Sequence, residues 1–211
     1  MPRVRKELLD AAARLSRRDR ALGTVIKSGG PPDVRRGRPW RTHFAELVRA
    51  VCYQQLAGSA ARAIHGRLED LLGGDVTPEA VLAAGPDRLR AVGLSGSKAR
   101  TISDLAAHVV SGEVELERVA RLSDDEIVRE LTGVWGIGRW TAEMFLIFQL
   151  GRLDVWPVGD YGVRKGYATV HGLADVPSAK ELEPLGDSYR PYRSVAAWYC
   201  WRAADTALPT G

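Results

Sequence analysis

The stretch that decides the fold is LTGVWGIGRWTAEMFLIFQLGRLDVWPVGDYGVRKG, residues 131 to 166. Just before it, Ser123 and three acidic residues open an apolar-periodic run that ends at Gly133, the pattern of a capped helix with a glycine stop. A tight turn over 134–138 follows, and residues 140–150 are apolar on most faces, which predicts a buried second helix. The sequence therefore predicts two helices joined by a glycine hairpin.

Gly136 and Gly138 give this hairpin a physical use beyond the turn itself. Glycine has no Cβ, so the backbone can turn sharply and approach another molecule closely. The first amides of the second helix lack partners inside the helix and carry the positive end of its dipole, which suits a phosphate. Arg139 adds positive charge there. Taken alone, however, Gly-x-Gly is more often a helix corner whose glycines serve only packing.

A second segment, PVGDYGVRKG at 157–166, places Asp160 after two chain breakers. Residues 131–143 resemble the hairpin of the helix–hairpin–helix (HhH-GPD) DNA glycosylases, and residues 157–166 resemble their Gly/Pro-rich catalytic loop. The likeness is to the 3-methyladenine DNA glycosylase II branch, which excises alkylated bases. It covers roughly residues 40–205 and rests on the joint match of hairpin, spacing and aspartate.

The resemblance implies that Asp160 is the catalytic residue, either stabilising the sugar cation or orienting the attacking water. It also implies a base pocket with aromatic walls, because a cationic base stacks well on electron-rich rings. Trp140, Tyr161 and Trp201 are the candidates for these walls. Met144 is a further candidate pocket residue, at a position where some relatives have a tyrosine that lines the pocket. Relatives that also cut the strand have a lysine at position 140, so a monofunctional hydrolase is expected here.

Two further segments are candidate DNA contacts. The resemblance implies that Leu56 is a wedge that enters the base stack, with Gln55 filling the gap beside it. On the residues alone, we would favour Leu56 as a hydrophobic residue closing a corner between helices. Ser97 and Lys98 begin a helix and are candidates for a second phosphate clamp, the alternative being a capped helix with solvated Lys98 and Arg100.

Composition sets wider limits. A chain of 211 residues is enough for one large domain or two small lobes, and a net charge of +4 permits a nucleic-acid partner without proving one. No apolar run is long enough for a membrane span. Cys52 and Cys200 are too few for the four-thiolate iron–sulfur cluster of some glycosylases, and the histidines lack metal-ligand spacing. We expect no cofactor, apart from a monovalent cation on hairpin carbonyls that the resemblance alone implies.

No strand alternation of useful length is visible, so the predicted class is all-α. We expect a two-lobed glycosylase fold without the N-terminal sheet-rich domain of some relatives. Residues 1–40 would be a helix and a basic loop packing on a core of residues 41–211, with a cleft lined by 55–56, 136–139 and 160. Helices are predicted over 4–22 and 42–56, and others are predicted to start at Ser59, Thr77 and Pro86. A long helix should follow the segment 93–100 and run to about Val110, and a last helix should end the core with Pro191 in its first turn.

The resulting prediction is a monomeric DNA glycosylase, cytoplasmic in a bacterium or nuclear in a eukaryote and not secreted. It would flip and excise alkylated purines such as 3-methyladenine and 7-methylguanine from double-stranded DNA. Two alternatives stay open. One is a glycosylase for neutral lesions such as uracil. The other is a non-catalytic DNA-binding module, which would need the hairpin but no carboxylate at position 160.

Overall fold

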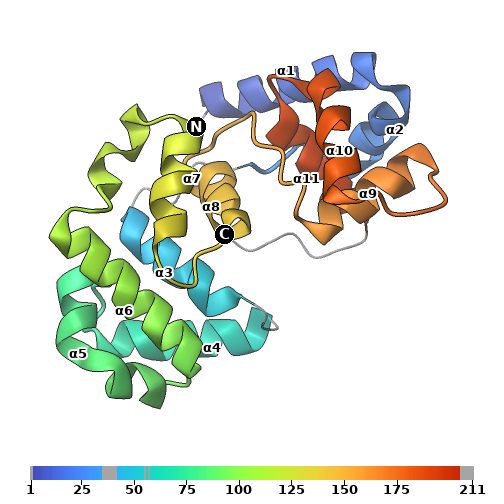
Figure 1. Cartoon of the computed structure of the whole chain (residues 1–211). Coiled ribbons are helices and arrows are strands. Elements are labelled where there is room, and N and C mark those ends of the chain that lie inside the picture. Colours follow the sequence, from blue (N-terminus) through green and yellow to red (C-terminus); the bar gives the residue numbers. More distant parts are fainter. Residues whose placement is uncertain (1, 35–41, 55, 57, 205–211) are drawn as a thin grey trace. The chain divides into compact units, whose positions relative to one another are not determined.

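The computed structural model describes residues 2–34, 42–54, 56 and 58–204. Within these ranges the ordered elements are all helices and no strand occurs, so the all-α prediction is confirmed (Figure 1). The elements are α1 (Pro2–Arg18), α2 (Arg20–Gly29), α3 (His43–Tyr53), α4 (Gly58–Leu71), α5 (Pro78–Ala91), α6 (Gly96–Ser111), a 3₁₀ helix (Leu116–Arg121), α7 (Asp124–Gly133), α8 (Arg139–Met144), a π-helical turn (Phe145–Gln149), α9 (Tyr161–His171), α10 (Ala179–Leu185), a 3₁₀ turn (Gly186–Tyr189) and α11 (Arg193–Ala203).

The chain divides into two compact units. The first, here called the terminal unit, contains α1 and α2 together with α9, α10 and α11; the second, the central unit, contains α3 to α8. The predicted boundary at residue 40 lies outside the described residues. No helix in the described ranges combines the length and the apolar character needed to cross a membrane.

In the terminal unit, helices from both ends of the chain pack around α11 (Figure 1). The first two helices lie beside α11, and α9 packs on it most extensively. Gly166 of α9 allows this close approach, because a Cβ there would overlap the backbone carbonyl of Cys200. The core of this unit is aliphatic and aromatic, with Leu15, Leu22 and Tyr199 fully buried.

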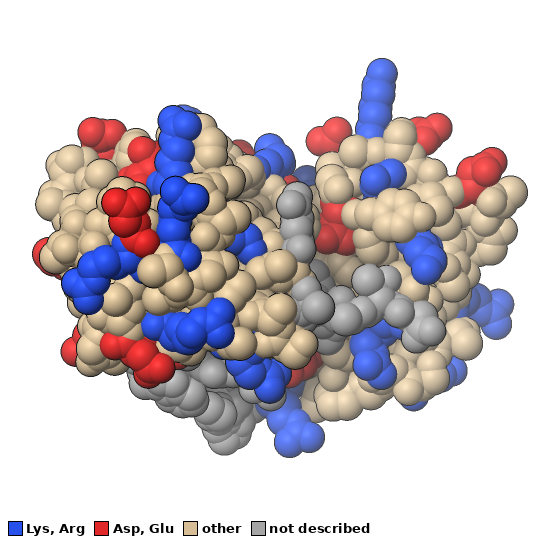
Figure 2. Space-filling view, turned by 90° about the horizontal axis from the view of Figure 1, so that it is seen from below, with Lys and Arg blue, Asp and Glu red and all other residues tan. Residues whose placement is uncertain are grey.

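In the central unit, the helix starts follow the capping signals of the sequence. Thr42, Thr77, Ser95 and Ser123 each cap the helix that follows by accepting a hydrogen bond from a backbone amide. α5 is broken at Gly85, where φ is +73°, so a second segment begins at the next residue, as predicted. Figure 2 shows that the visible face of this unit carries Lys and Arg interspersed with Asp and Glu.

Four expectations about helix limits differ from the structure. The helix predicted over 4–22 is two helices, because Asp19 caps α2 by accepting a hydrogen bond from the Leu22 amide at 3.0 Å. α2 then continues to Gly29, into the segment predicted to be a loop. Pro191 precedes Tyr192, the N-cap of α11, so it is not in the first turn. The helix predicted up to residue 150 changes after Met144 into a π-helical turn.

Candidate active site and hairpin

Asp160 is the N-cap of α9, and its carboxylate is held from two helices. Its Oδ1 accepts a hydrogen bond from the Val163 amide at 2.8 Å and another from Trp201 Nε1 at 2.9 Å. The side chain is nearly buried, with 8% of its surface exposed. A carboxylate fixed in this way cannot rotate freely, so its charge has a defined direction.

The segment before Asp160 is also held tightly. The Asp160 amide donates to the Pro157 carbonyl at 2.9 Å, closing a turn. Trp156 is buried, and its Nε1 donates to the Leu182 carbonyl on α10 at 3.1 Å. Rigid supports on both sides of the turn therefore keep the carboxylate in one place.

The four candidate pocket residues are divided between the two units. Tyr161 and Trp201 belong to the terminal unit with Asp160; Tyr161 is 60% exposed and Trp201 only 1%. Trp140 and Met144 lie on α8 of the central unit, where Trp140 is partly exposed and Met144 is buried. The structure thus brings two aromatic residues to the aspartate, while a shared pocket of all four stays a prediction.

The two hairpin glycines play different structural parts. Gly136 has φ of +81°, and a Cβ there would overlap the Thr101 side chain on α6, so this position requires glycine. Gly138 has φ of −88°, and a Cβ there would meet nothing within 4 Å. The adjacent Trp135 amide donates to Asp104 Oδ2 at 2.7 Å, which anchors the hairpin to α6.

The cations near the hairpin have contacts within the protein. Arg139 is exposed and pairs with Glu143 at 2.9 Å, so part of its charge is compensated. Lys98 Nζ donates to the Cys52 carbonyl at 2.8 Å, at the end of α3. Burial lowers the pKa of Lys98, an effect that the Coulombic interaction with Cys52 opposes. Arg100 instead lies over the Trp135 ring at 4.1 Å, next to the hairpin, a contact that the sequence interpretation missed.

The wedge prediction is only partly visible in the structure. Gln55 lies outside the described residues, whereas Leu56 is described and 41% exposed. The preceding Gln54 donates through Nε2 to Thr141 Oγ1 on α8 at 3.1 Å, which ties the junction after α3 to the second helix of the hairpin motif. Ser97 is exposed near the start of α6, where a phosphate could approach it. The phosphate and wedge roles stay predictions.

Metal and cation sites can be tested against the side chains present. In the part of the chain that the structure describes, no group of three or more His, Cys, Asp or Glu residues could hold a metal ion. The hairpin would offer backbone carbonyls instead, and that of Val134 already accepts a hydrogen bond from Ile137 at 3.1 Å. A monovalent cation at the hairpin therefore stays a prediction based on the resemblance.

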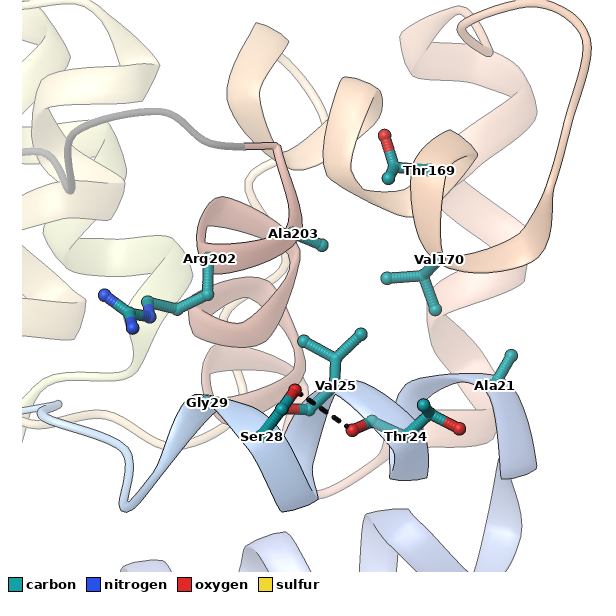
Figure 3. A pocket seen from close by; sticks show the side chains of 9 residues that line it. All are labelled: Ala21, Thr24, Val25, Ser28, Gly29, Thr169, Val170, Arg202 and Ala203. Carbon is teal, nitrogen blue, oxygen red and sulfur yellow. Dashed lines mark hydrogen bonds between the residues drawn. The ribbon is translucent and has the colours of Figure 1, made fainter.

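A pocket of about 530 Å³ lies elsewhere on the terminal unit, between α2, α9 and α11 (Figure 3). It touches α9 at Thr169 and Val170, near the end opposite to Asp160. The hydroxyls of Thr24 and Ser28 at this pocket donate to backbone carbonyls of their own helix, at 3.2 Å each. None of the predicted site residues lines this pocket, so it is separate from the candidate active site.

Comparisons with known proteins agree with one another. The family described as "HhH-GPD superfamily base excision DNA repair protein" matches residues 48–190. DNA-3-methyladenine glycosylase 1 of Schizosaccharomyces pombe is 35% identical, covering 95% of this chain and 89% of that protein. The structure of 3-methyladenine DNA glycosylase from the same yeast, in complex with abasic DNA, matches with a TM-score of 0.84 at 34% identity, covering 96% of this chain and 99% of that one. A DNA-3-methyladenine glycosidase from Bacillus halodurans matches with a TM-score of 0.81 at 35% identity, covering 91% and 88%.

Proposed function

The chain belongs to the HhH-GPD superfamily of base excision DNA repair proteins, and we propose that it hydrolyses the N-glycosidic bond of alkylated purines in double-stranded DNA. The family resemblance seen in the sequence is thereby confirmed. Relatives that cover most of this chain are named 3-methyladenine DNA glycosylases, and one of them was solved with abasic DNA. Both facts support a base-excising enzyme rather than a module that only binds DNA.

The observation that carries the proposal is the fixed carboxylate of Asp160. Cleavage of an N-glycosidic bond builds positive charge on the sugar, and a preorganised negative group stabilises that charge without having to reorient during the reaction. The hydrogen bonds from Val163 and Trp201 provide this preorganisation. An alkylated purine such as 3-methyladenine is already cationic, hence a good leaving group that needs little general-acid help.

The proposed reaction ends with base release. Position 140 is tryptophan, so the chain has no lysine there to attack the sugar and form a Schiff base. Lys165 is exposed on α9, a helical turn beyond Asp160, where it suits a backbone phosphate better than the sugar carbon. We therefore propose a monofunctional hydrolase, in which exposed Tyr161 contacts the flipped base and exposed Leu56 enters the stack.

The decisive variant is Asp160→Asn, measured by single-turnover release of 3-methyladenine or 7-methylguanine from a duplex. Asn caps a helix nearly as well as Asp, so the fold should be kept while the negative charge is lost. We expect the excision rate to fall about a hundredfold or more. Binding to the damaged duplex should be unchanged or tighter, because the charge acts mainly in the transition state.

A matched control is Asp19→Asn, which changes another helix-capping aspartate of the terminal unit, far along the chain from the catalytic loop. This variant should excise at close to the wild-type rate. A near-wild-type rate in Asp160→Asn would remove the aspartate from catalysis. The wild-type protein is also tested on duplexes with uracil, with an alkylated purine and without damage. Release of uracil alone would contradict the proposed substrate, and binding without release of any base would contradict the proposed enzyme activity.

A further inference from the structure

Three buried tryptophans of the terminal unit differ in what their indole N–H groups contact. Trp201 donates to the Asp160 carboxylate at 2.9 Å, and Trp156 donates to the backbone carbonyl of Leu182 at 3.1 Å. Trp198, one turn before Trp201 on α11, is buried with no hydrogen-bond partner for its Nε1. Of these three indoles, only Trp201 therefore donates its N–H to an ionisable group.

The position of this contact matters for the carboxylate. Val163 and Trp201 both donate to the same oxygen, Oδ1, but from different helices. Rotation of the carboxylate about its bond to Cβ moves Oδ1 away from its donors, so with the α9 amide alone such a rotation would break one hydrogen bond. A second donor from α11 approaches from another direction and restricts that rotation. Hydrogen bonds to an ionised acceptor are also stronger than those between neutral groups.

The indole that donates is itself immobilised. Gly162 lies against it, so close that a Cβ at this position would stand 2.9 Å from Trp201 Cδ1 and 3.0 Å from Asp160 Oδ1. Phe148 packs on the indole with ring centroids 5.7 Å apart. Trp201 is 1% exposed, whereas Tyr161 beside the same aspartate is 60% exposed. An aromatic wall for a base needs an accessible face, which Tyr161 has.

We propose that Trp201 is a positioning residue, which fixes the Asp160 carboxylate through its indole N–H and does not form a wall of the base pocket. This assignment rests on the proposed function, because Asp160 has to be the catalytic residue for its orientation to affect excision. It replaces the pocket role that the family resemblance implied for Trp201. A structural role alone would require the ring of Trp201 but not its N–H group.

The first experiment compares Trp201→Phe with Trp198→Phe in the full-length protein. Both variants lose similar volume from the buried face of α11, but only Trp201→Phe loses a hydrogen bond. Single-turnover excision of 3-methyladenine and binding to a duplex with a non-hydrolysable alkylated-purine nucleotide, which keeps the base, are measured below the melting midpoint of every variant. We expect Trp201→Phe to excise about tenfold or more slowly than Trp198→Phe, because small misplacements of a catalytic group are costly. Binding should change by less than about threefold in both variants, because the position of the carboxylate matters mainly in the transition state.

The second experiment does not depend on activity. The indole N–H resonances of ¹⁵N-labelled protein are recorded, and the Trp201 resonance is identified by its loss in Trp201→Phe. Asp160→Asn keeps an acceptor but removes the charge, so the Trp201 resonance should move upfield and its proton should exchange faster. The resonances of Trp156 and Trp198 should stay in place, because neither indole contacts Asp160 through an N–H bond.

Each outcome supports or overturns the assignment. Equal excision rates in Trp201→Phe and Trp198→Phe would overturn it, and so would a loss of binding as large as the loss of rate, which is the signature of a base wall. A Trp201 resonance that does not respond to Asp160→Asn would overturn it whatever the enzyme does. If the wild-type protein releases no alkylated base, the proposed function fails, and a shifted resonance would still support the positioning contact.

Discussion

Gly162→Ala tests whether the position of the carboxylate, and not only its charge, sets the excision rate. The new Cβ would stand 2.9 Å from Trp201 Cδ1 and 3.0 Å from Asp160 Oδ1, whereas ordinary contact begins at 3.4 Å. Both neighbours are held on one side by other contacts, Trp201 by Phe148 and Asp160 by the Val163 amide. The indole or the carboxylate therefore has to withdraw by about half an ångström from its present place.

The cost in stability is moderate. Overpacking a tight site costs about 1–3 kcal/mol, while alanine in place of a helical glycine returns about 1 kcal/mol. The net loss for Gly162→Ala is then about 0–2 kcal/mol, which for a chain of this size lowers Tm by roughly 0–8 °C. The protein stays folded at 25 °C, so a change in excision rate can be attributed to the site.

The cost in rate should be larger than the cost in stability suggests. A withdrawal of half an ångström stretches the 2.9 Å bond from Trp201 to Asp160 towards the limit of a useful hydrogen bond. Because a misplacement of about 1 Å can cost on the order of a hundredfold, half of that shift predicts a loss of about tenfold. Binding of an undamaged duplex should be unaffected, since no phosphate-binding group moves.

The assay is single-turnover excision from an alkylated duplex at 25 °C, with a thermal melt and a duplex-binding titration on the same preparation. Gly66→Ala is the control, because this glycine lies within α4 and a Cβ there meets nothing within 4 Å. The control should raise Tm by roughly 2–4 °C through helix propensity and leave the rate unchanged. A wild-type rate in a folded Gly162→Ala variant would refute the reasoning.

The remaining predictions concern the hairpin and the thiols. Gly138→Val should leave the fold intact, because its Cβ points into open space, and should weaken binding to duplexes of any sequence about equally; a loss confined to one sequence would contradict a phosphate contact. Gly136→Ala should instead lower Tm, since it combines a φ of +81° with overlap against Thr101, and an unchanged melt would contradict this. Burial raises the pKa of Cys52 to about 12, so little of its reactive thiolate forms at pH 8. The folded protein should therefore react with a thiol reagent far more slowly than the protein in denaturant, and equal rates would contradict this prediction.

The parts of the fold that the sequence predicted well are those fixed by near neighbours. Ser123 and Glu126 form a reciprocal capping box, with the Ser123 amide donating to the Glu126 carboxylate at 2.7 Å. A capping box needs only residues three positions apart, so its signal is complete within the sequence. The same holds for the proline after Thr77 and for the glycine turn at 136–138.

The predictions that were wrong or incomplete depend on competing signals or on distant partners. The run over 4–22 kept its apolar period through Asp19, but the cap at Asp19 ended one helix and began another. Lys98 was interpreted from its position at a helix start, while its amine contacts Cys52, 46 positions earlier in the chain. The contact between Arg100 and Trp135 is similarly long-range. Such pairs become visible only when α6 is placed against its neighbours.

Asp160 shows why a structural and a catalytic interpretation of one residue need not compete. The bond from the Val163 amide makes Asp160 a helix cap, which on its own would be a sufficient structural role. A cap, however, can be Ser, Thr or Asn as well as Asp. The need for a cap therefore does not explain why a second, buried donor, the Trp201 indole, meets the same oxygen. The cap holds the side chain at the positive end of the α9 dipole, which favours a negative charge there. The indole of α11 then restricts the carboxylate's direction, so the cap of α9 and this bond together orient the charge to which we assign the proposed excision.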